Sequence, residues 1–270
     1  MSYFAGKRIL ITGAGSGLGR RMALRMAREG GRIIAWDISA EALEKVLAEL
    51  KMASGGVHLG MVCDVSDSKT VYRKAEAVKT KAGQPDILIN NAGMVSGKRF
   101  LDCSDEEIQR TMGVNTMALF WTTKAFLPEM IARNAGHVVT VASAAGLVGV
   151  AKLADYCASK FAAVGFDESV RAELKHTAPG VKTTVICPYY ITTGMFEGVK
   201  TRFSWLLPIT DERYAADRMV SAIRRQRPRL IMPPLVYTVP LLRMMPVAVF
   251  DWVAYFLGIN SSMEDFRGRN

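Results

Sequence analysis

The chain alternates short runs of apolar residues with longer segments in which apolar residues recur at helical spacing. Residues Leu18–Gly30 and Ser39–Leu50, for example, have the 3.6-residue period of amphipathic helices. The predicted strands are the apolar runs Arg8–Thr12, Arg32–Trp36, His58–Cys63, Ile87–Asn90, His137–Ala142, Lys182–Cys187 and Arg229–Met232. Continuous apolar strands separated by helices are typical of a parallel sheet covered on both faces. The pattern therefore predicts an α/β fold with a seven-stranded parallel sheet.

The end of the chain departs from this alternation. From Pro233 to Leu257 the sequence is unusually apolar and contains several prolines. Its longest uncharged run, Leu230–Leu242, is shorter than the roughly 20 residues of a membrane-spanning helix, and prolines oppose such a helix. We therefore expect residues 233–270 to form an apolar C-terminal extension that caps a pocket, packs on a partner subunit or lies on a membrane surface.

Composition favours a compact globular protein, since 50% of the residues are hydrophobic and 22% are charged. No linker divides the chain, so residues 1–270 are predicted to form a single catalytic domain. The net charge is +10, but Lys and Arg are scattered along the predicted helices. This distribution is typical of solvated helix faces and argues against a nucleic-acid partner.

The cysteines and the start of the chain bear on chemistry and location. The 4 cysteines are widely spaced and form no CxxC pair, so the sequence indicates neither a metal site nor a disulfide framework. A reducing compartment fits this pattern. An apolar strand begins within the first ten residues in place of a signal peptide, and we therefore expect a cytoplasmic protein, with peripheral membrane contact as an alternative.

A glycine-rich loop, TGAGSGLG at residues 12–19, lies directly between the first predicted strand and the first predicted helix. Gly13 permits a tight turn, while Gly17 and Gly19 let the backbone and the helix approach closely. A pyrophosphate can then meet the positive N-terminus of the helix. In this strand, loop and helix context the motif predicts dinucleotide binding.

Asp37 closes the second predicted strand, at the distance from the loop expected of a carboxylate that accepts from the adenosine ribose hydroxyls. A 2′-phosphate there would meet a negative charge, and neither Ser16 nor Ile38 is basic. NAD is therefore favoured over NADP. An aspartate in a helix-start turn is the structural alternative for this position.

Further motifs follow in a fixed order: CDV at 63–65, NNAG at 90–93, Asn115, Ser143, and Tyr156 with Lys160. With the glycine loop they resemble the short-chain dehydrogenase/reductase family over residues 7–195. The resemblance implies a three-layer, doubly wound Rossmann fold and a homodimer or homotetramer, with residues 106–133 and 154–176 as candidate interface helices. The C-terminal extension is similar to that of the membrane-associated and lipid-droplet-associated retinol and hydroxysteroid dehydrogenases of the family.

The resemblance implies a catalytic group of Asn115, Ser143, Tyr156 and Lys160. A free tyrosine has a pKa of about 10, so a nearby cation such as Lys160 is needed to favour its anion near neutrality. The hydroxyl of Ser143 would hold the substrate oxygen, and Asn115 would support a water chain to Lys160. Taken alone, a tyrosine and a lysine four positions apart meet on any helix, and a serine after a strand is most often a turn residue.

The cofactor contacts are expected in the glycine loop and at the carboxyl ends of the later strands. Asn90 is expected beside them, and Tyr189 stands where the family usually has glycine. The expected contacts are Gly13, Ser16, Gly17, Leu18, Gly19, Asp37, Ile38, Asp64, Val65, Asn91, Ala92, Gly93, Tyr156, Lys160, Pro188, Ile191 and Thr193.

The segments that follow the strands are apolar, and Ala145, Leu153, Tyr189 and Met195 are the expected substrate contacts. They favour a bulky apolar alcohol or ketone, such as a steroid, a retinoid or a long aliphatic carbinol. The alternative is that these residues are ordinary core or dimer contacts. Competing functions are an NADP-dependent ketone or aldehyde reductase, a sugar-nucleotide epimerase or dehydratase, and a catalytically silent cofactor-binding protein on lipid surfaces. The complete catalytic group favours the NAD-dependent dehydrogenase.

Overall fold

The computed structural model describes residues 2–268. Its centre is a seven-stranded parallel sheet in the order β3-β2-β1-β4-β5-β6-β7, so that β3 and β7 are the edge strands. The strands are β1 (Arg8–Thr12), β2 (Arg32–Asp37), β3 (Leu59–Val62), β4 (Ile87–Asn90), β5 (Gly136–Val141), β6 (Val181–Pro188) and β7 (Arg229–Met232). The predicted seven-stranded parallel sheet is therefore confirmed.

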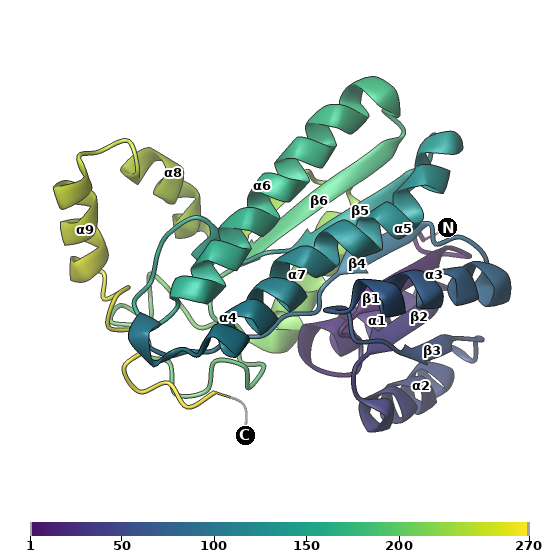
Figure 1. The fold of residues 1–270 in the computed structure, drawn as a ribbon, viewed down its shortest axis with the longest axis horizontal. Coiled ribbons are helices and arrows are strands. Elements are labelled where there is room, and N and C mark those ends of the chain that lie inside the picture. Colours follow the sequence, from purple (N-terminus) through teal and green to yellow (C-terminus); the bar gives the residue numbers. More distant parts are fainter. Residues whose placement is uncertain (1, 269–270) are drawn as a thin grey trace.

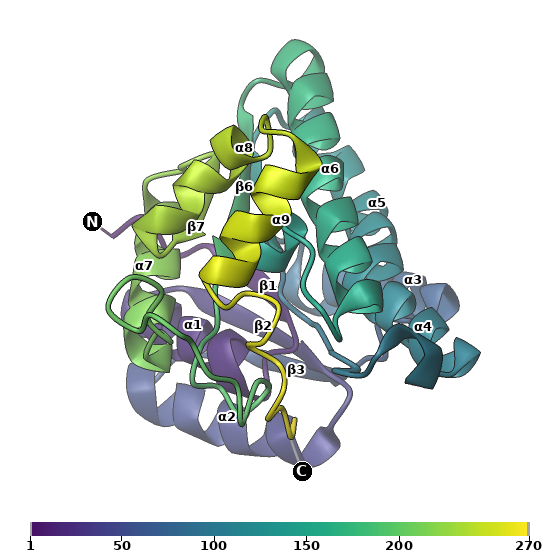
Figure 2. The same ribbon diagram turned by 90° about the vertical axis from the view of Figure 1, so that its left-hand side faces the viewer.

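Helices cover both faces of this sheet (Figures 1 and 2). Helices α1, α2 and α7 lie on one face, and α3, α5 and α6 lie on the other. The helices are α1 (Gly17–Arg28), α2 (Ala40–Ser54), α3 (Ser68–Ala82), α4 (Asp105–Met112), α5 (Ala118–Ala132), α6 (Ala154–Thr177), α7 (Glu212–Arg224), α8 (Val239–Leu242) and α9 (Val247–Phe256). This is the three-layer, doubly wound arrangement expected from the sequence.

Alternate residues of each strand enter alternate halves of the core, because successive side chains of a strand point to opposite faces. Ile9 and Ile11 of β1 pack beneath α1 and α7, whereas Leu10 packs with the helices of the opposite face. All three are fully buried. Strands buried on both sides read as continuous apolar runs, which is why the sequence pattern located them well.

The third strand is shorter than the sequence pattern predicts. The ring nitrogen Nδ1 of His58 accepts from the backbone N–H of Ile33 at 3.1 Å. Pairing between β2 and β3 begins only one residue later, at Ile34 and Leu59. A side chain therefore satisfies the N–H group that a longer β3 would have to pair.

The order of the strands reverses between β1 and β4, since the chain from β1 proceeds outward to β3 and then returns to the other side of β1. At such a switch point the connections leave in opposite directions and open a crevice at the carboxyl ends of the strands. Thr12 of β1 spans this crevice, because its Oγ1 accepts from the backbone N–H groups of Asn91 and Ala92, each at 3.0 Å.

The extension after β7 forms a 3-10 helix (Pro234–Thr238) followed by α8 and α9. Figure 1 shows α8 and α9 away from the helical layers, at the end of the molecule where α6 begins. Large apolar side chains of this hairpin face solvent, among them Leu241, Met244, Val247, Trp252 and Tyr255. Along residues 2–268 no helix combines the length and the apolar character needed to cross a membrane.

Candidate active site

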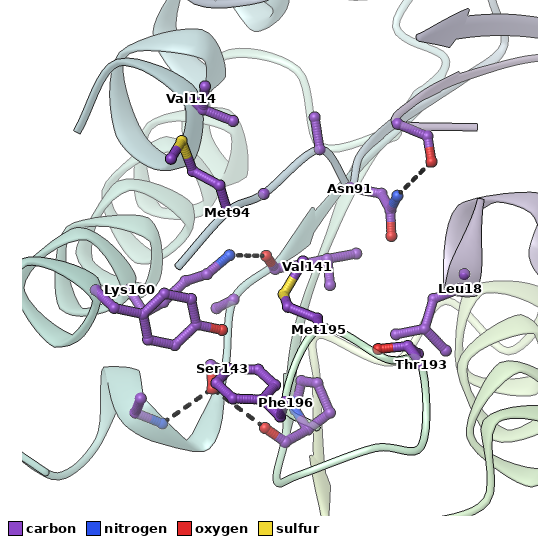
Figure 3. A pocket seen from close by; sticks show the side chains of 18 of the residues that line it. Leu18, Asn91, Met94, Val114, Val141, Ser143, Lys160, Thr193, Met195 and Phe196 are labelled. Atoms are coloured by element: carbon purple, nitrogen blue, oxygen red, sulfur yellow. Dashed lines mark hydrogen bonds between the residues drawn. The ribbon is translucent and has the colours of Figure 1, made fainter. Parts of the chain in front are cut away.

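The glycine loop is held in one shape by close backbone contacts. Gly13 has a φ of +64°, and a Cβ atom there would lie 2.9 Å from Cα of Ala92. A Cβ atom on Gly19 would lie 2.0 Å from the carbonyl oxygen of Gly13, so only glycine lets α1 begin this close to the loop. The side-chain amide of Asn91 donates to the same oxygen at 3.1 Å, as part of the arrangement in Figure 3.

Asp37 lies at the end of β2 beside this loop, and both of its carboxylate oxygens accept from the backbone. Gly15 donates to Oδ2 at 2.8 Å, and Ser39 donates to Oδ1 at 3.0 Å. These contacts fix the carboxylate at the rim of the cavity described next. The loop conformation and the start of α2 therefore depend on the residue that was expected to select the cofactor.

A cavity of about 320 Å³ opens at the switch point, above the carboxyl ends of the central strands. Its polar end lies between the glycine loop and the loop after β4, at the N-terminus of α1. That end fits a dinucleotide, because the loop has no side chain at Gly13, the first turn of α1 carries no acidic residue, and Asp37 supplies an acceptor. The remaining lining comes from the segments after β5 and β6.

The predicted cofactor and substrate contacts gather around this one cavity. All lie in its lining except Gly19, whose contact with the carbonyl of Gly13 holds the loop from behind. Asn90 is also turned away, because its amide binds Thr122 and Thr123 of α5. The expected contacts that line the cavity are Gly13, Ser16, Gly17, Leu18, Asp37, Ile38, Asp64, Val65, Asn91, Ala92, Gly93, Ala145, Leu153, Tyr156, Lys160, Pro188, Tyr189, Ile191, Thr193 and Met195.

Helix α6 presents Tyr156 and Lys160 to the cavity from its first two turns. Asp155 in the first turn and Lys175 and His176 in the last turn complement the helix dipole. Lys160 is 4% exposed, and its Nζ donates to the carbonyl oxygen of Val141 at 3.0 Å (Figure 3). Burial lowers the pKa of Lys160 to about 8, since removal from water disfavours the ammonium.

Tyr156 is equally buried, and burial raises its pKa above the ordinary value, while a hydrogen bond with the side chain of Ser143 opposes that rise. Nζ of Lys160 lies 5.6 Å from the centroid of the tyrosine ring. Burial is the largest influence on the pKa of Tyr156 and favours the neutral phenol, so the lowering of this pKa by Lys160 together with an oxidised nicotinamide stays a prediction. Additional positive charge in the cavity is needed to produce tyrosinate near neutrality.

Ser143 follows β5 and lies beside the tyrosine. Its Oγ accepts from the backbone N–H of Ala145 at 3.1 Å and donates to the carbonyl oxygen of Pro188 at 3.4 Å. The second distance is at the limit of a hydrogen bond, so the O–H can turn from Pro188 to an incoming substrate oxygen at little cost. The three side chains of Ser143, Tyr156 and Lys160 thus meet at one cavity, as the sequence motifs indicated.

Asn115 occupies a different place. It lies in a π-helical turn, Gly113–Met117, between α4 and α5, and it is outside the cavity lining. Its Oδ1 accepts from the backbone N–H of Met94 at 2.9 Å, and its Nδ2 donates to the carbonyl of Met94 at 2.9 Å and to Oγ of Ser159 at 3.0 Å. The side chain therefore joins the loop after β4 to α6, and this connection helps to position Lys160 on that helix.

The substrate end of the cavity is apolar and aromatic. Tyr156 packs edge-on against Phe196 at 5.6 Å between centroids, and Phe196 packs against Tyr190 at 5.2 Å. The ring of Tyr189, at the position where a glycine was expected, packs against that of Tyr190 in a tilted arrangement, with centroids 4.6 Å apart. Ile259, from the segment after α9, also lines this end, and no motif or periodicity in the sequence indicated it.

Comparisons with known proteins agree with this architecture. The family profile described as short chain dehydrogenase matches residues 7–202. Epidermal retinol dehydrogenase 2 of Homo sapiens is 47% identical over 264 residues, which cover 97% of this chain and 85% of the relative. Retinol dehydrogenase 10 of Homo sapiens is 40% identical over 290 residues, with coverage of 97% and 85%.

Solved structures give the same result. A short-chain dehydrogenase/reductase from Burkholderia phymatum in complex with NAD superimposes with a TM-score of 0.80 at 29% identity, covering 90% of this chain and 95% of that one. A metagenomic short-chain oxidoreductase in complex with NADP gives 0.71 at 26% identity, with coverage of 86% and 98%. The chain belongs to the short-chain dehydrogenase family. It is an oxidoreductase that acts on CH–OH groups with a nicotinamide cofactor.

Proposed function

We propose that the protein uses NAD to interconvert a hydrophobic alcohol and its ketone or aldehyde. One observation carries this proposal: the cavity places Ser143, Tyr156 and Lys160 beside an apolar, aromatic substrate end. Among the described residues that line the cavity, the charged ones are Asp37, Asp64, Arg110 and Lys160. Of these, Lys160 contacts the tyrosine ring, and its ammonium is already bound to the carbonyl of Val141. An apolar alcohol loses little on burial in these surroundings.

In the proposed reaction the hydroxyl of Ser143 donates to the substrate oxygen and fixes its position, and the oxygen of Tyr156 takes the hydroxyl proton. A bound nicotinamide cofactor supplies hydride acceptance at the carbinol carbon. Lys160 places its ammonium between α6 and Val141, where its charge favours the tyrosinate and its N–H groups can hold a ribose hydroxyl. The positive charge of the oxidised nicotinamide adds to that of Lys160 and opposes the effect of burial on the pKa of Tyr156.

Retinoids, steroids and long aliphatic carbinols are the proposed substrates, because the aromatic walls suit large apolar molecules and because two relatives are named retinol dehydrogenases. The test is a panel of alcohols offered to the purified protein with NAD, with NADH followed by its absorbance. Turnover should rise from short alkanols to retinol, hydroxysteroids and long secondary alkanols. Turnover confined to polar alcohols would refute the proposed substrate class.

Preference for NAD is proposed from the carboxylate of Asp37, which would repel a 2′-phosphate. Asp37→Asn removes the charge and keeps one of the two oxygens that accept from the backbone N–H groups of Gly15 and Ser39. The ratio of kcat/KM with NAD to kcat/KM with NADP should fall by about tenfold, the effect of roughly 1.4 kcal/mol of lost repulsion. Asp64→Asn, a neutralisation elsewhere in the same cavity, is the control and should leave the ratio unchanged. An unchanged ratio in Asp37→Asn would contradict this assignment.

Residues 1–270 are proposed to form one catalytic domain, and the extension 233–270 is proposed to contact lipid surfaces through the α8–α9 hairpin. Leu241, Trp252 and Tyr255 are 69%, 65% and 72% exposed. Exposed aromatic and aliphatic side chains on short helices insert at the interface of a bilayer, where apolar burial is favourable.

Replacing Leu241, Trp252 and Tyr255 together by Ser should abolish co-flotation with liposomes, because the apolar face that inserts is lost. The measurement is the fraction of protein that floats with phosphatidylcholine vesicles, with and without anionic lipid. The matched control is the triple replacement of Met52, Val57 and Leu101, which are even more exposed and lie outside the hairpin. Equal flotation of the hairpin variant and the control would refute attachment through α8 and α9.

A homodimer or homotetramer is proposed through residues 106–133 and 154–176, which include α5 and α6. On the outer side of these helices Phe120, 46% exposed, packs against Phe166 with centroids 4.8 Å apart. This aromatic patch suits an interface between copies of the chain. Light scattering of the purified protein should give the mass of two or four chains, and a monomer at micromolar concentration would contradict the proposal.

A further inference from the structure

The segment that follows α9, residues 259–267, folds back onto the substrate end of the cavity. Ile259 lines the cavity itself. Met263 is fully buried in the same apolar cluster as Leu153 and Tyr156. Phe266 lies 6.3 Å, centroid to centroid, from Phe196, the ring that packs on the tyrosine. This segment, which we call the return segment, therefore forms the outer support of the substrate end.

Two glycines make room for the return segment. A Cβ atom at Gly97 would lie 1.9 Å from the ring of Phe266, and one at Gly198 would lie 2.0 Å from the carbonyl oxygen of Asp265. The loop after β4 and the loop after β6 both leave space at the points where the segment passes. The absence of side chains at these two glycines therefore lets the return segment pack directly against both loops.

Backbone hydrogen bonds join the return segment to the loop after β6, from Lys200 to Ser262 and from Arg267 to Glu197, and side chains add further polar contacts. The hydroxyls of Tyr190 and Ser262 are 2.8 Å apart. On the other side, Nζ of Lys152 donates to the carbonyl oxygens of Met263 and Glu264, each at 3.2 Å. One ammonium thus holds two consecutive peptide carbonyls, and hydrogen bonds from a charged donor are stronger than those between neutral groups.

Lys152 is also unusual in its backbone, which has a φ of +63°. A residue other than glycine in the left-handed region costs about 1 kcal/mol, so it persists only where its surroundings hold it. Lys152 directly precedes Leu153, the residue that caps α6 and lines the cavity. The hydrogen bonds of Lys152 therefore connect the return segment to the start of α6, the helix that carries Tyr156.

We propose that Lys152 is a specificity-determining positioning residue, whose ammonium clamps the return segment against the substrate end and so sets the fit of long apolar alcohols. This inference rests on the proposed function, because the apolar alcohol is the molecule whose fit is set. Lys152 does not line the cavity and takes no part in proton transfer. A short alcohol reaches Ser143 and Tyr156 without touching the support that the return segment gives.

The test compares decan-2-ol with propan-2-ol in the full-length protein. Lys152→Met keeps the aliphatic stem and removes both donors, and it should raise KM for decan-2-ol by about tenfold, the loss of a charge-assisted hydrogen bond. KM for propan-2-ol and kcat for both alcohols should change by less than about twofold. Lys152→Arg retains the donors and should restore KM toward the wild-type value.

The matched control is Lys200→Met, which removes an ion pair to Asp265 of the same segment. That pair is 2.7 Å long, but its side chains are 79% and 59% exposed, and such pairs contribute little. The control should therefore behave as the wild type. A KM for decan-2-ol that is unchanged in Lys152→Met, or raised equally in Lys200→Met, would overturn the proposed clamp.

Two further readouts separate the clamp from general destabilisation. Lys152→Gly relieves the left-handed conformation, so its Tm should be unchanged or higher while KM for decan-2-ol still rises. Amide hydrogen exchange of residues 257–268 should be faster in Lys152→Met and Lys152→Gly than in the wild type. Wild-type protein that turns over no long alkanol would refute the proposed function, whereas wild-type turnover with unchanged exchange in both variants would overturn the clamp alone.

Discussion

Tyr156→Phe should lower kcat by about a thousandfold while the affinity for NADH changes by less than about twofold. Only the hydroxyl is lost, and general acid–base catalysis by one positioned group contributes about 10²–10⁴-fold to the rate. The ring remains in place to pack against Phe196, so the shape of the cavity is kept. The measurements are steady-state oxidation of the best alcohol in the panel and fluorescence titration with NADH.

Tyr214→Phe is the control, because Tyr214 lies on α7 and is 57% exposed. It should leave both kcat and NADH affinity at their wild-type values. A Tyr156→Phe protein that keeps a tenth or more of wild-type turnover would show that another group accepts the proton.

Lys160→Met should lower kcat by about a hundredfold or more. In the absence of cofactor it should also increase the free energy of unfolding at pH 7. The charged lysine is buried, and its pKa of about 8 in the folded protein lies below the ordinary value of 10.5. That difference corresponds to a penalty of about 3 kcal/mol for folding with the ammonium charged. Lys160→Met removes this penalty but leaves the carbonyl of Val141 without its donor. The free energy of unfolding should therefore rise by about 2 kcal/mol.

The direction of the pH dependence follows from the two pKa values. Between pH 8 and pH 10.5 the unfolded chain binds the lysine proton more fully than the folded protein, so wild-type stability rises with pH over that window. Below pH 8 the penalty is complete and constant. Urea unfolding at pH 7 and at pH 9.5 should therefore show the advantage of Lys160→Met shrinking as pH rises. An advantage that is the same at both values would mean that Lys160 does not titrate in this range.

Local patterns in the sequence were sufficient to indicate all seven strands, because the central strands are buried on both faces and are largely apolar. They also indicated the cofactor end, since a glycine loop between a strand and a helix, with an aspartate at the end of the next strand, is a local pattern. The burial of Lys160 and Tyr156 is different in kind. It depends on the backbone carbonyl of Val141 and on side chains from the segments after β5 and β6 and from the return segment, which no spacing on α6 describes.

The same distinction explains the remaining differences. The amide of Asn115 contacts Met94 and Ser159 from a π-helical turn, whereas its support of a water chain to Lys160 stays a prediction. The period of the apolar residues did not predict that turn. Ile259 reaches the cavity only because the chain returns after α9, a tertiary event with no local signal.

The two edge strands of the sheet have a consequence for solubility. An unpaired strand edge is a template on which another chain can add by backbone hydrogen bonds, and long, flat edges promote aggregation. Here β3 and β7 have only four residues each. On β7 the hydroxyl of Tyr237 accepts from the backbone N–H of Ile231 at 3.2 Å, so the first turn of the extension occupies the edge. The short length of both edges and this side-chain contact on β7 therefore limit the backbone that is free to pair with a strand of another chain.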